Sequence, residues 1–174
     1  MTTSLIHQPA LHAYKIDNAD TINRSLIHGF EQHIHDGDNK KSHFFNDRYE
    51  NIYIDSSKIP EITTILNTAI KLAAEILCMP ATQLKAGLWF NAMGKGDITL
   101  PHRHDDDDEL LSAVYYVRIP DNSGKLILSH RNFRTQVEPE EGLFVFFPAD
   151  MLHEVTANQS DQMRLSLGIN IGPA

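Results

Sequence analysis

The chain has 174 residues, of which 41% are hydrophobic and 22% charged, and it carries a formal net charge of -8. This size and composition are typical of one folded globular domain and exclude a disordered chain. The acidic charge argues against nucleic acid or an anionic membrane as a partner, because both attract clustered Lys and Arg. The sequence has no signal-peptide pattern and no long apolar run, so we expect a cytoplasmic protein.

The first part of the chain predicts a short strand around residues 11–16 and then a helix. Apolar residues recur at helical spacing from Ile22 to Ile34, and either Asp17 or Asp20 is expected to cap this helix. The helix is expected to end at about His35, before the glycine of a turn.

A second strand is expected over residues 50–55, followed by the clearest helix of the chain. This helix begins at Pro60 and ends near Cys78, and one continuous apolar face predicts that it packs against a sheet. Cys78 is the only cysteine, and its place in the apolar pattern predicts a small buried side chain. His43 falls in a polar stretch that we interpret as a loop, with no sign of a ligand role.

From about residue 84 the pattern changes to short strands separated by turn signals. We expect strands near residues 87–92, 99–104, 112–118, 125–129, 136–137, 143–147, 154–157 and 164–171. About eight short antiparallel strands after a helical part predict a mainly β fold of the jelly-roll type, with N-terminal helices.

Two histidines stand two residues apart in the expected strand over residues 99–104. Side chains at i and i+2 point to the same face of a strand, so His102 and His104 can aim at one point. A third histidine, His153, follows a buried strand and a turn. A bound metal ion is the first explanation for imidazoles that converge in this way.

The last expected strand carries an unusual cation. Arg164, Ser166 and Asn170 fall on one face of this otherwise apolar segment. A buried Arg is costly unless an anion pairs with it, and a carboxylate is its natural bidentate partner. The sequence therefore predicts an acid-binding group near the metal site.

Residues 86–171 resemble the 2-oxoglutarate/Fe(II)-dependent dioxygenase superfamily, and in particular its small bacterial and phage members. The resemblance rests on the order and spacing of Trp89, Asn91, His102, His104, Ser112, Tyr115, Tyr116, Phe147, Pro148, His153, Arg164, Ser166 and Asn170. It implies a single domain over residues 1–174, in which residues 1–83 support a double-stranded β-helix, a cupin-like jelly roll, over residues 84–174.

The resemblance also implies the contents of the site. Fe(II) is the expected metal, held by His102, His104 and His153, and no catalytic residue is expected beyond these ligands. 2-Oxoglutarate is the expected co-substrate, and the distal carboxylate of this molecule would bind Arg164 and Ser166. The implied reaction is the hydroxylation of a small-molecule or peptide substrate.

Two further residues match positions near the co-substrate in the superfamily. Tyr116 stands where members often contact 2-oxoglutarate, and Asn91 faces the same region. The resemblance therefore implies that both help to bind the co-substrate.

The chain departs from the superfamily in its carboxylate ligand. Members normally use His-x-Asp followed by a distant His, which leaves three metal positions open. Gly96 stands six residues before His102, a spacing that favours His102 as the first ligand and places His104 where Asp is usual. The alternative register takes His104, Asp106 and His153 as the ligands.

Two other interpretations remain open at this point. A cupin site would use His102, His104, Glu109 and His153 without 2-oxoglutarate, but it leaves Arg164 unexplained. A binding or structural jelly roll without catalysis would make His102 and His104 ordinary surface residues at a strand end, and His153 would cap a turn. The sequence identifies neither the substrate nor the oligomeric state, for which a homodimer is one alternative.

Overall fold

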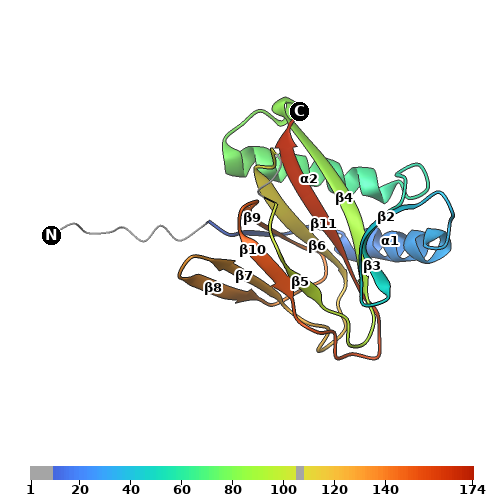
Figure 1. Cartoon of the computed structure of the whole chain (residues 1–174). Coiled ribbons are helices and arrows are strands. Elements are labelled where there is room, and N and C mark those ends of the chain that lie inside the picture. The colour runs from blue at the N-terminus through green and yellow to red at the C-terminus, as the bar shows by residue number, and fades with distance from the viewer. Residues whose placement is uncertain (1–9, 105–107) are drawn as a thin grey trace.

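The structure is a computed structural model that describes residues 10–104 and 108–174 (Figure 1). In chain order the elements are β1 (His12–Lys15), α1 (Ala19–His33), β2 (Lys40–Phe45), β3 (Arg48–Tyr53), α2 (Glu61–Leu77), η1 (Ala81–Gln83), β4 (Leu84–Met93), β5 (Thr99–His102), β6 (Leu111–Arg118), β7 (Leu126–His130), β8 (Phe133–Val137), β9 (Leu143–Pro148), β10 (Leu152–Val155) and β11 (Arg164–Pro173). No helix within these residues is both long and apolar enough to cross a membrane.

The strands form two antiparallel sheets. The large sheet has seven strands in the order β1-β9-β6-β11-β4-β3-β2, and the small sheet has four in the order β5-β10-β7-β8. The predicted mainly β fold is therefore confirmed, including all eight strands expected after residue 84. Apart from the β2–β3 hairpin, neighbouring strands of the large sheet come from separate parts of the chain, so pairing decides which side chains meet.

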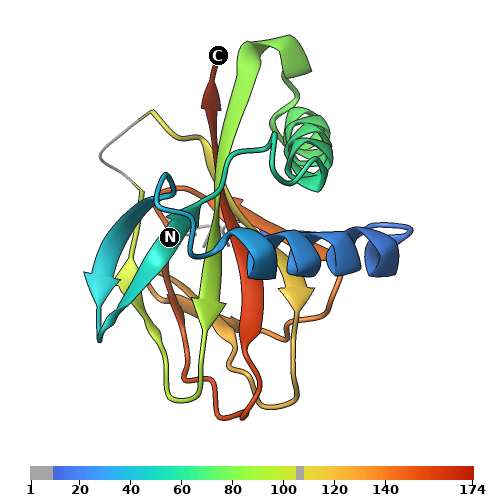
Figure 2. The same cartoon turned by 90° about the vertical axis from the view of Figure 1, so that its right-hand side faces the viewer.

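Both helices pack on the large sheet and cover its outer face. In Figure 1 they lie on the side away from β7 and β8, and in Figure 2 α1 crosses the direction of the long strands. Buried apolar residues of α2, such as Ile62 and Ile65, join the same core as Phe30 of α1 and Phe90 of β4. The Phe30 and Phe90 rings lie 5.1 Å apart, centroid to centroid. The inner face of the sheet is thereby left for the site.

Two expectations for the helix ends are wrong. Helix α1 begins after Asn18, whose backbone is left-handed (φ 61°) and whose side chain makes no cap, so neither Asp17 nor Asp20 caps it. Asp20 lies in the first helical turn, where a carboxylate favours the helix dipole. Cys78 is exposed, not buried. It ends α2 in a left-handed conformation (φ 52°), outside the apolar periodicity that suggested burial.

The interpretation of His43 as a loop residue is also wrong. It lies in β2, which forms a hairpin with β3 at the edge of the large sheet. Most side chains of β2 are exposed, so the strand lacks the alternation of apolar and polar residues that marks a half-buried strand. This hairpin turns out to form one wall of the site.

Candidate metal centre and its pocket

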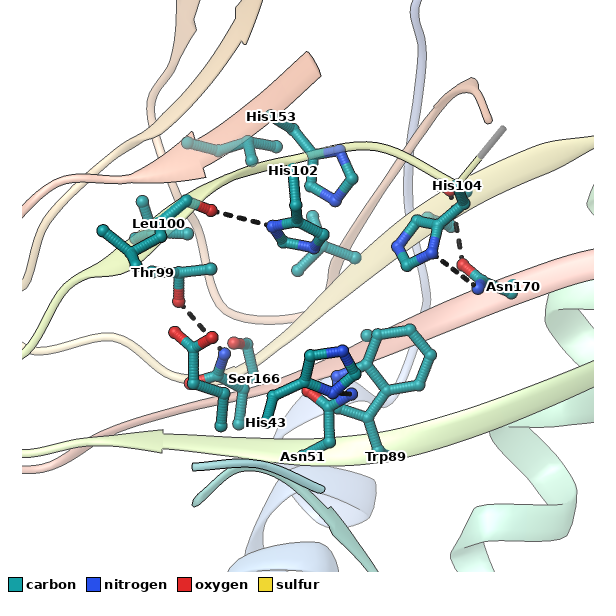
Figure 3. Close-up of a pocket in the computed structure, with 18 of the residues that line it drawn as sticks. His43, Asn51, Trp89, Thr99, Leu100, His102, His104, His153, Ser166 and Asn170 are labelled. Atoms are coloured by element: carbon teal, nitrogen blue, oxygen red, sulfur yellow. Dashed lines mark hydrogen bonds between the residues drawn. The ribbon is translucent and has the colours of Figure 1, made fainter. Parts of the chain in front are cut away.

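Three histidines from two neighbouring strands lie close together (Figure 3). His102 on β5 and His153 on β10 are direct partners in the antiparallel register, and the centroids of their rings are 4.1 Å apart. The His104 ring centroid lies 5.2 Å from that of His102 and 5.3 Å from that of His153. One ring nitrogen from each histidine lies within 4.8 Å of the others. The structure thus brings together the three residues expected to hold a metal.

His104 reaches this group by a route that strand periodicity does not describe. Strand β5 ends at His102, so His104 lies just beyond it. Its backbone N–H donates a hydrogen bond to the carbonyl oxygen of Ala149 at 2.9 Å, in the turn before β10. This bond holds the segment after β5 against the turn that leads to His153.

The backbone sets the tautomer of two of the histidines. His102 Nδ1 lies 2.8 Å from the carbonyl oxygen of Leu100, and His153 Nδ1 lies 2.9 Å from that of Met151. A carbonyl oxygen only accepts, so both Nδ1 atoms carry the proton and both Nε2 atoms keep a free lone pair. Burial, together with the nearby His102, lowers the pKa of His153 to about 3, so its ring is neutral at neutral pH. Both rings are therefore prepared as metal ligands.

His104 has a different neighbour, the amide of Asn170. Asn170 Nδ2 lies 3.3 Å from His104 Nδ1 and also donates to Glu109 Oε1 at 3.3 Å. The other Glu109 carboxylate oxygen is buried without a hydrogen-bond partner in the described residues. Glu109 does not belong to the histidine group, so the four-ligand cupin set is not assembled. Asp106, the ligand of the alternative register, lies outside the described residues.

The histidines open onto a cavity of about 340 Å³ between the two sheets. Its walls include Trp89 of β4, Phe147 of β9 and Val155 of β10, and the β2–β3 hairpin closes one side with His43 and Phe44. Gly168 faces Trp89 across β11 and β4, and a Cβ atom at Gly168 would lie 2.4 Å from the indole ring. Glycine therefore leaves the room that the indole ring needs in the pocket wall.

Three of the four residues expected to bind 2-oxoglutarate lie in one row across three strands. Ser166 of β11 pairs with Tyr116 of β6 on one side and with Asn91 of β4 on the other. Ser166 and Asn91 line the cavity, whereas Tyr116 and Arg164 do not. Arg164 lies two residues before Ser166 on the same face of β11, so it stands behind the wall that Ser166 forms.

Arg164 is buried, with 1% of its surface exposed, and no carboxylate of the described residues pairs with it. Its Nη1 donates to the carbonyl oxygens of Ser123 at 3.3 Å and Gly124 at 2.8 Å, and its guanidinium lies 5.5 Å from the centre of the Tyr116 ring. Gly124 has a φ of 90°, and a Cβ atom there would lie 2.2 Å from the carbonyl oxygen of Thr156. A glycine turn therefore supplies the carbonyl groups that hold the guanidinium.

Unsatisfied polar atoms surround this cation. Arg164 Nε, the Tyr116 hydroxyl and Ser123 Oγ are all buried without a hydrogen-bond partner in the part of the chain that the structure describes. Burial lowers the pKa of Arg164 and raises that of Tyr116 to about 12. A buried cation next to unused hydroxyl donors is an environment that suits a carboxylate.

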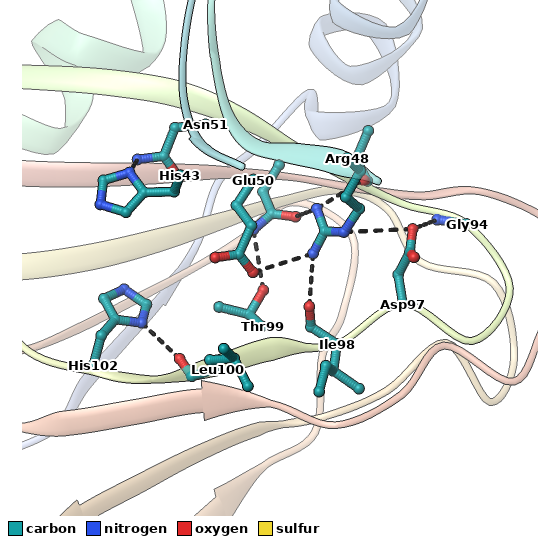
Figure 4. A network of polar contacts seen from close by, with 12 residues as sticks. His43, Arg48, Glu50, Asn51, Gly94, Asp97, Ile98, Thr99, Leu100 and His102 are labelled. Atoms are coloured by element: carbon teal, nitrogen blue, oxygen red, sulfur yellow. Dashed lines mark hydrogen bonds and ion pairs between the residues drawn. The ribbon is translucent and has the colours of Figure 1, made fainter. Parts of the chain in front are cut away.

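Asn91 is held by a polar network that the sequence did not reveal. Figure 4 shows Arg48, Glu50 and Thr99 of this network. Its Oδ1 accepts from Arg48 Nη1 at 3.4 Å, and its Nδ2 donates to Thr99 Oγ1 at 3.2 Å. Arg48 and Glu50, both on β3, complete this network. These two residues carry opposite charges and stand at i and i+2, just before the buried Ile52. This spacing could have indicated a polar face on that strand.

Comparison with known protein families finds a match over part of the chain. Residues 129–170 match the sequence model of a family described as "Putative 2OG-Fe(II) oxygenase". The search of curated proteins found no match.

Solved structures share the fold over nearly the whole chain. A prolyl-4-hydroxylase from Pseudomonas putida superposes with a TM-score of 0.74 at 20% identity, over 96% of this chain and 94% of that one. The α-ketoglutarate-dependent epimerase SnoN from nogalamycin biosynthesis gives 0.72 at 12% identity, over 94% and 76%. A prolyl hydroxylase from Trichoplax adhaerens, solved with a peptide fragment of hypoxia inducible factor, gives 0.70 at 13% identity, over 95% and 84%.

These structural likenesses bear on the fold, which is the double-stranded β-helix of these oxygenases. The family match lies where β7 to β11 supply His153, Arg164 and Ser166. The chain therefore resembles the 2OG-Fe(II) oxygenases in sequence over residues 129–170, and shares the fold of these solved structures over nearly its whole length.

Proposed function

We propose that this protein is an Fe(II)- and 2-oxoglutarate-dependent dioxygenase that hydroxylates a small-molecule or peptide substrate. The observation that carries the proposal is the pairing of two features in one cavity region. One is the group formed by His102, His104 and His153. The other is the buried Arg164, which lacks an anionic partner among the described residues.

The histidine group fits Fe(II). Imidazole nitrogen is a good ligand for this ion, and three protein ligands leave positions open for other molecules. His102 and His153 are neutral donors whose Nδ1 protons are already bonded to carbonyl oxygens. Such hydrogen bonds orient a ligand ring and increase its basicity.

The surroundings of Arg164 fit the distal carboxylate of 2-oxoglutarate. Arg164 Nε and the Tyr116 hydroxyl offer unused donors, and Ser166, two residues after Arg164 on β11, lines the cavity. Asn91, fixed by Arg48 and Thr99, would contribute a rigid polar side to the same region. The apolar walls, including Phe147 and Val155, would keep water away from the reacting groups.

When bound, iron and 2-oxoglutarate supply the oxidation: O2 inserts one oxygen atom into a C–H bond and the other into succinate, with release of CO2. In this reaction the protein would hold the metal through three imidazoles, orient the acid group of the co-substrate, and position the target C–H bond. The protein residues thus contribute binding and orientation.

The proposal is tested by CO2 and succinate release from 2-oxoglutarate with Fe(II), even without a coupled substrate. We expect release by the wild-type protein and a loss to background in the double variant His102→Ala/His153→Ala. The double variant His28→Ala/His35→Ala is the matched control, because it removes two exposed histidines outside the pocket. Equal release by all three proteins would show that adventitious iron is responsible.

The cupin alternative, a metal site that does not use 2-oxoglutarate, is favoured by one observation: Arg164 does not line the cavity. Calorimetry with the metal-loaded protein separates the two. For the dioxygenase, Arg164→Gln should weaken 2-oxoglutarate binding at least about tenfold, as expected for loss of a charge-assisted hydrogen bond, and leave the metal affinity unchanged. For the cupin type, the wild-type protein would bind metal but not 2-oxoglutarate.

A further inference from the structure

One wall of the cavity is formed by the β2–β3 hairpin. Strand β3 pairs with β4 through Ile52 and Phe90, and the register extends no further toward the start of β3. Glu50 and Asn51, which precede Ile52 on β3, line the cavity. Glu50 and Asn51 are neither metal ligands nor residues proposed to hold 2-oxoglutarate, although Asn91, one of the latter, bonds to Arg48 of β3.

Glu50 places a carboxylate in this wall. The residue is 8% exposed, and its Oε1 accepts from Arg48 Nη2 at 3.3 Å. In Figure 4 the second oxygen turns away from Arg48, toward the space between His43 and His102. No donor of the described residues bonds to this second oxygen, so it is available to a ligand.

Arg48 does not neutralise this carboxylate by itself. Its Nη2 also donates to the carbonyl oxygen of Ile98 at 2.7 Å, and its Nε lies 3.5 Å from Asp97 Oδ2. One guanidinium thus stands between two carboxylates, Glu50 and Asp97, which leaves the cluster with a net charge of about -1. Asp97 does not line the cavity, so Glu50 is the member of the pair that a ligand can meet.

The rest of the cavity wall makes this charge significant. Among the described residues that line the cavity, Glu50 is the only acid, and no Lys or Arg lines it. An ionised carboxylate in a small, largely apolar cavity is costly unless a donor or cation meets it. A cavity of about 340 Å³ lies near the lower end for small-molecule sites and must also admit 2-oxoglutarate, so the reacting part of the substrate is small.

We propose that Glu50 is a specificity residue that pairs with a protonated amino group of the substrate. The proposal rests on the dioxygenase function above and names the substrate class as an alkylammonium compound. The ammonium group would be held at the hairpin wall while its alkyl carbons lie toward the three histidines. A free amine and a lysine-type side chain of a peptide share this chemistry.

The test compares probes of equal size by ligand-observed NMR at pH 7. Binding of n-butylamine, n-butanol and butyrate is measured with the wild-type protein, first metal-free and then loaded with Co(II) and 2-oxoglutarate without oxygen. The wild-type protein should bind n-butylamine about tenfold more tightly than n-butanol, with butyrate the weakest, because a charge-assisted pair is stronger than a neutral one. A wild-type protein that binds amine and alcohol equally would overturn the proposal without any variant.

Two matched variants assign the preference to the pocket carboxylate. Glu50→Gln keeps the shape of the side chain and should bring the affinities for n-butylamine and n-butanol together. Asp97→Asn removes the other carboxylate that pairs with Arg48, which lies outside the cavity. This variant should keep the preference for the amine. An amine preference that survives in Glu50→Gln, or that disappears equally in both variants, contradicts the assignment.

The same experiment distinguishes a free amine from a lysine-type side chain of a peptide. It also distinguishes a failure of the amine proposal from a failure of the proposed dioxygenase function. A capped Gly-Lys-Gly peptide that binds more tightly than n-butylamine indicates a peptide substrate, and the reverse order indicates a free amine. If the dioxygenase function is wrong, Co(II) or 2-oxoglutarate will fail to bind, while the probe comparison with the metal-free protein still tests Glu50.

Discussion

At the scale of single residues, the site depends on which atom carries each proton. His102 and His153 each use the carbonyl oxygen two residues earlier, so their tautomers are set by the local backbone. His104 is oriented by Asn170, a side chain on a different strand. A metal on His104 Nε2 requires a proton on Nδ1, and then Asn170 must present its carbonyl oxygen to that proton.

This requirement predicts opposite effects for two substitutions of Asn170. Asn170→Asp supplies a permanent acceptor for His104 Nδ1–H and should tighten metal binding, whereas Asn170→Leu should weaken it about 10–100-fold, as removal of an outer hydrogen bond to a ligand does. Co(II) affinity, measured by visible absorption in competition with a chelator, checks both. Ser112→Ala is the control, because Ser112 bonds to Asn170 but to none of the three histidines. A Co(II) affinity within twofold of wild type in Asn170→Leu would show that Asn170 does not orient a ligand.

At the scale of elements, β11 organises the pocket. It lies between β6 and β4, and its residues from Arg164 to Asn170 alternate between the core and the site. Ser166 stands beside the proposed co-substrate residues, and Gly168 makes room for Trp89. The hairpin β2–β3, at the edge of the same sheet, adds a further wall. The co-substrate role is thus proposed for residues of the central strands, and the specificity role for a residue of the edge hairpin.

The close approach of Gly168 to Trp89 predicts a clear effect of a single methyl group. Gly168→Ala should displace the indole ring and lower the free energy of unfolding by about 1–3 kcal/mol through overpacking. Trp89 is the only tryptophan, so its fluorescence reports the displacement directly, and denaturant unfolding measures the stability. Gly87→Ala, on the neighbouring strand, has open space around the added Cβ and should change neither the emission nor the packing. An unchanged emission spectrum in Gly168→Ala would contradict the predicted clash.

At the scale of the whole molecule, the metal ligands come from separate parts of the chain that only folding brings together. His102 and His104 lie about fifty residues before His153 in the sequence, and the pairing of β5 with β10 joins them. A metal that binds this group binds the folded state in preference to the unfolded chain. Metal binding should therefore stabilise the entire fold.

Thermal unfolding provides the measurement. At a free metal concentration about 100 times Kd, linkage predicts about 2.7 kcal/mol of stabilisation, which corresponds to a rise in Tm of about 5–10 °C for a chain of this size. The rise should be absent in His102→Ala/His153→Ala and present in His28→Ala/His35→Ala. A similar rise in both double variants would place the stabilising metal elsewhere on the molecule.

The sequence by itself determined the fold class and the main chemical groups. Alternation and turn residues gave all eight strands after residue 84, because these signals are local in the chain. The three histidines and the cation at Arg164 were recognisable because such residue types are costly or unusual in their positions. Periodicity also placed Arg164 and Ser166 on one face of the same strand.

Only the tertiary structure decided how these groups meet. The pairing of β5 with β10 sets the distance between His102 and His153, and a contact with Ala149 holds His104 beyond the end of its strand. The pairing of β3 with β4 at Ile52 brings Glu50 to the cavity, although the charges of β3 in the sequence indicate only a polar face and not what that face meets. The physical reason is that periodicity fixes the face of a side chain, whereas its neighbours depend on pairing and twist between strands that are distant in the chain.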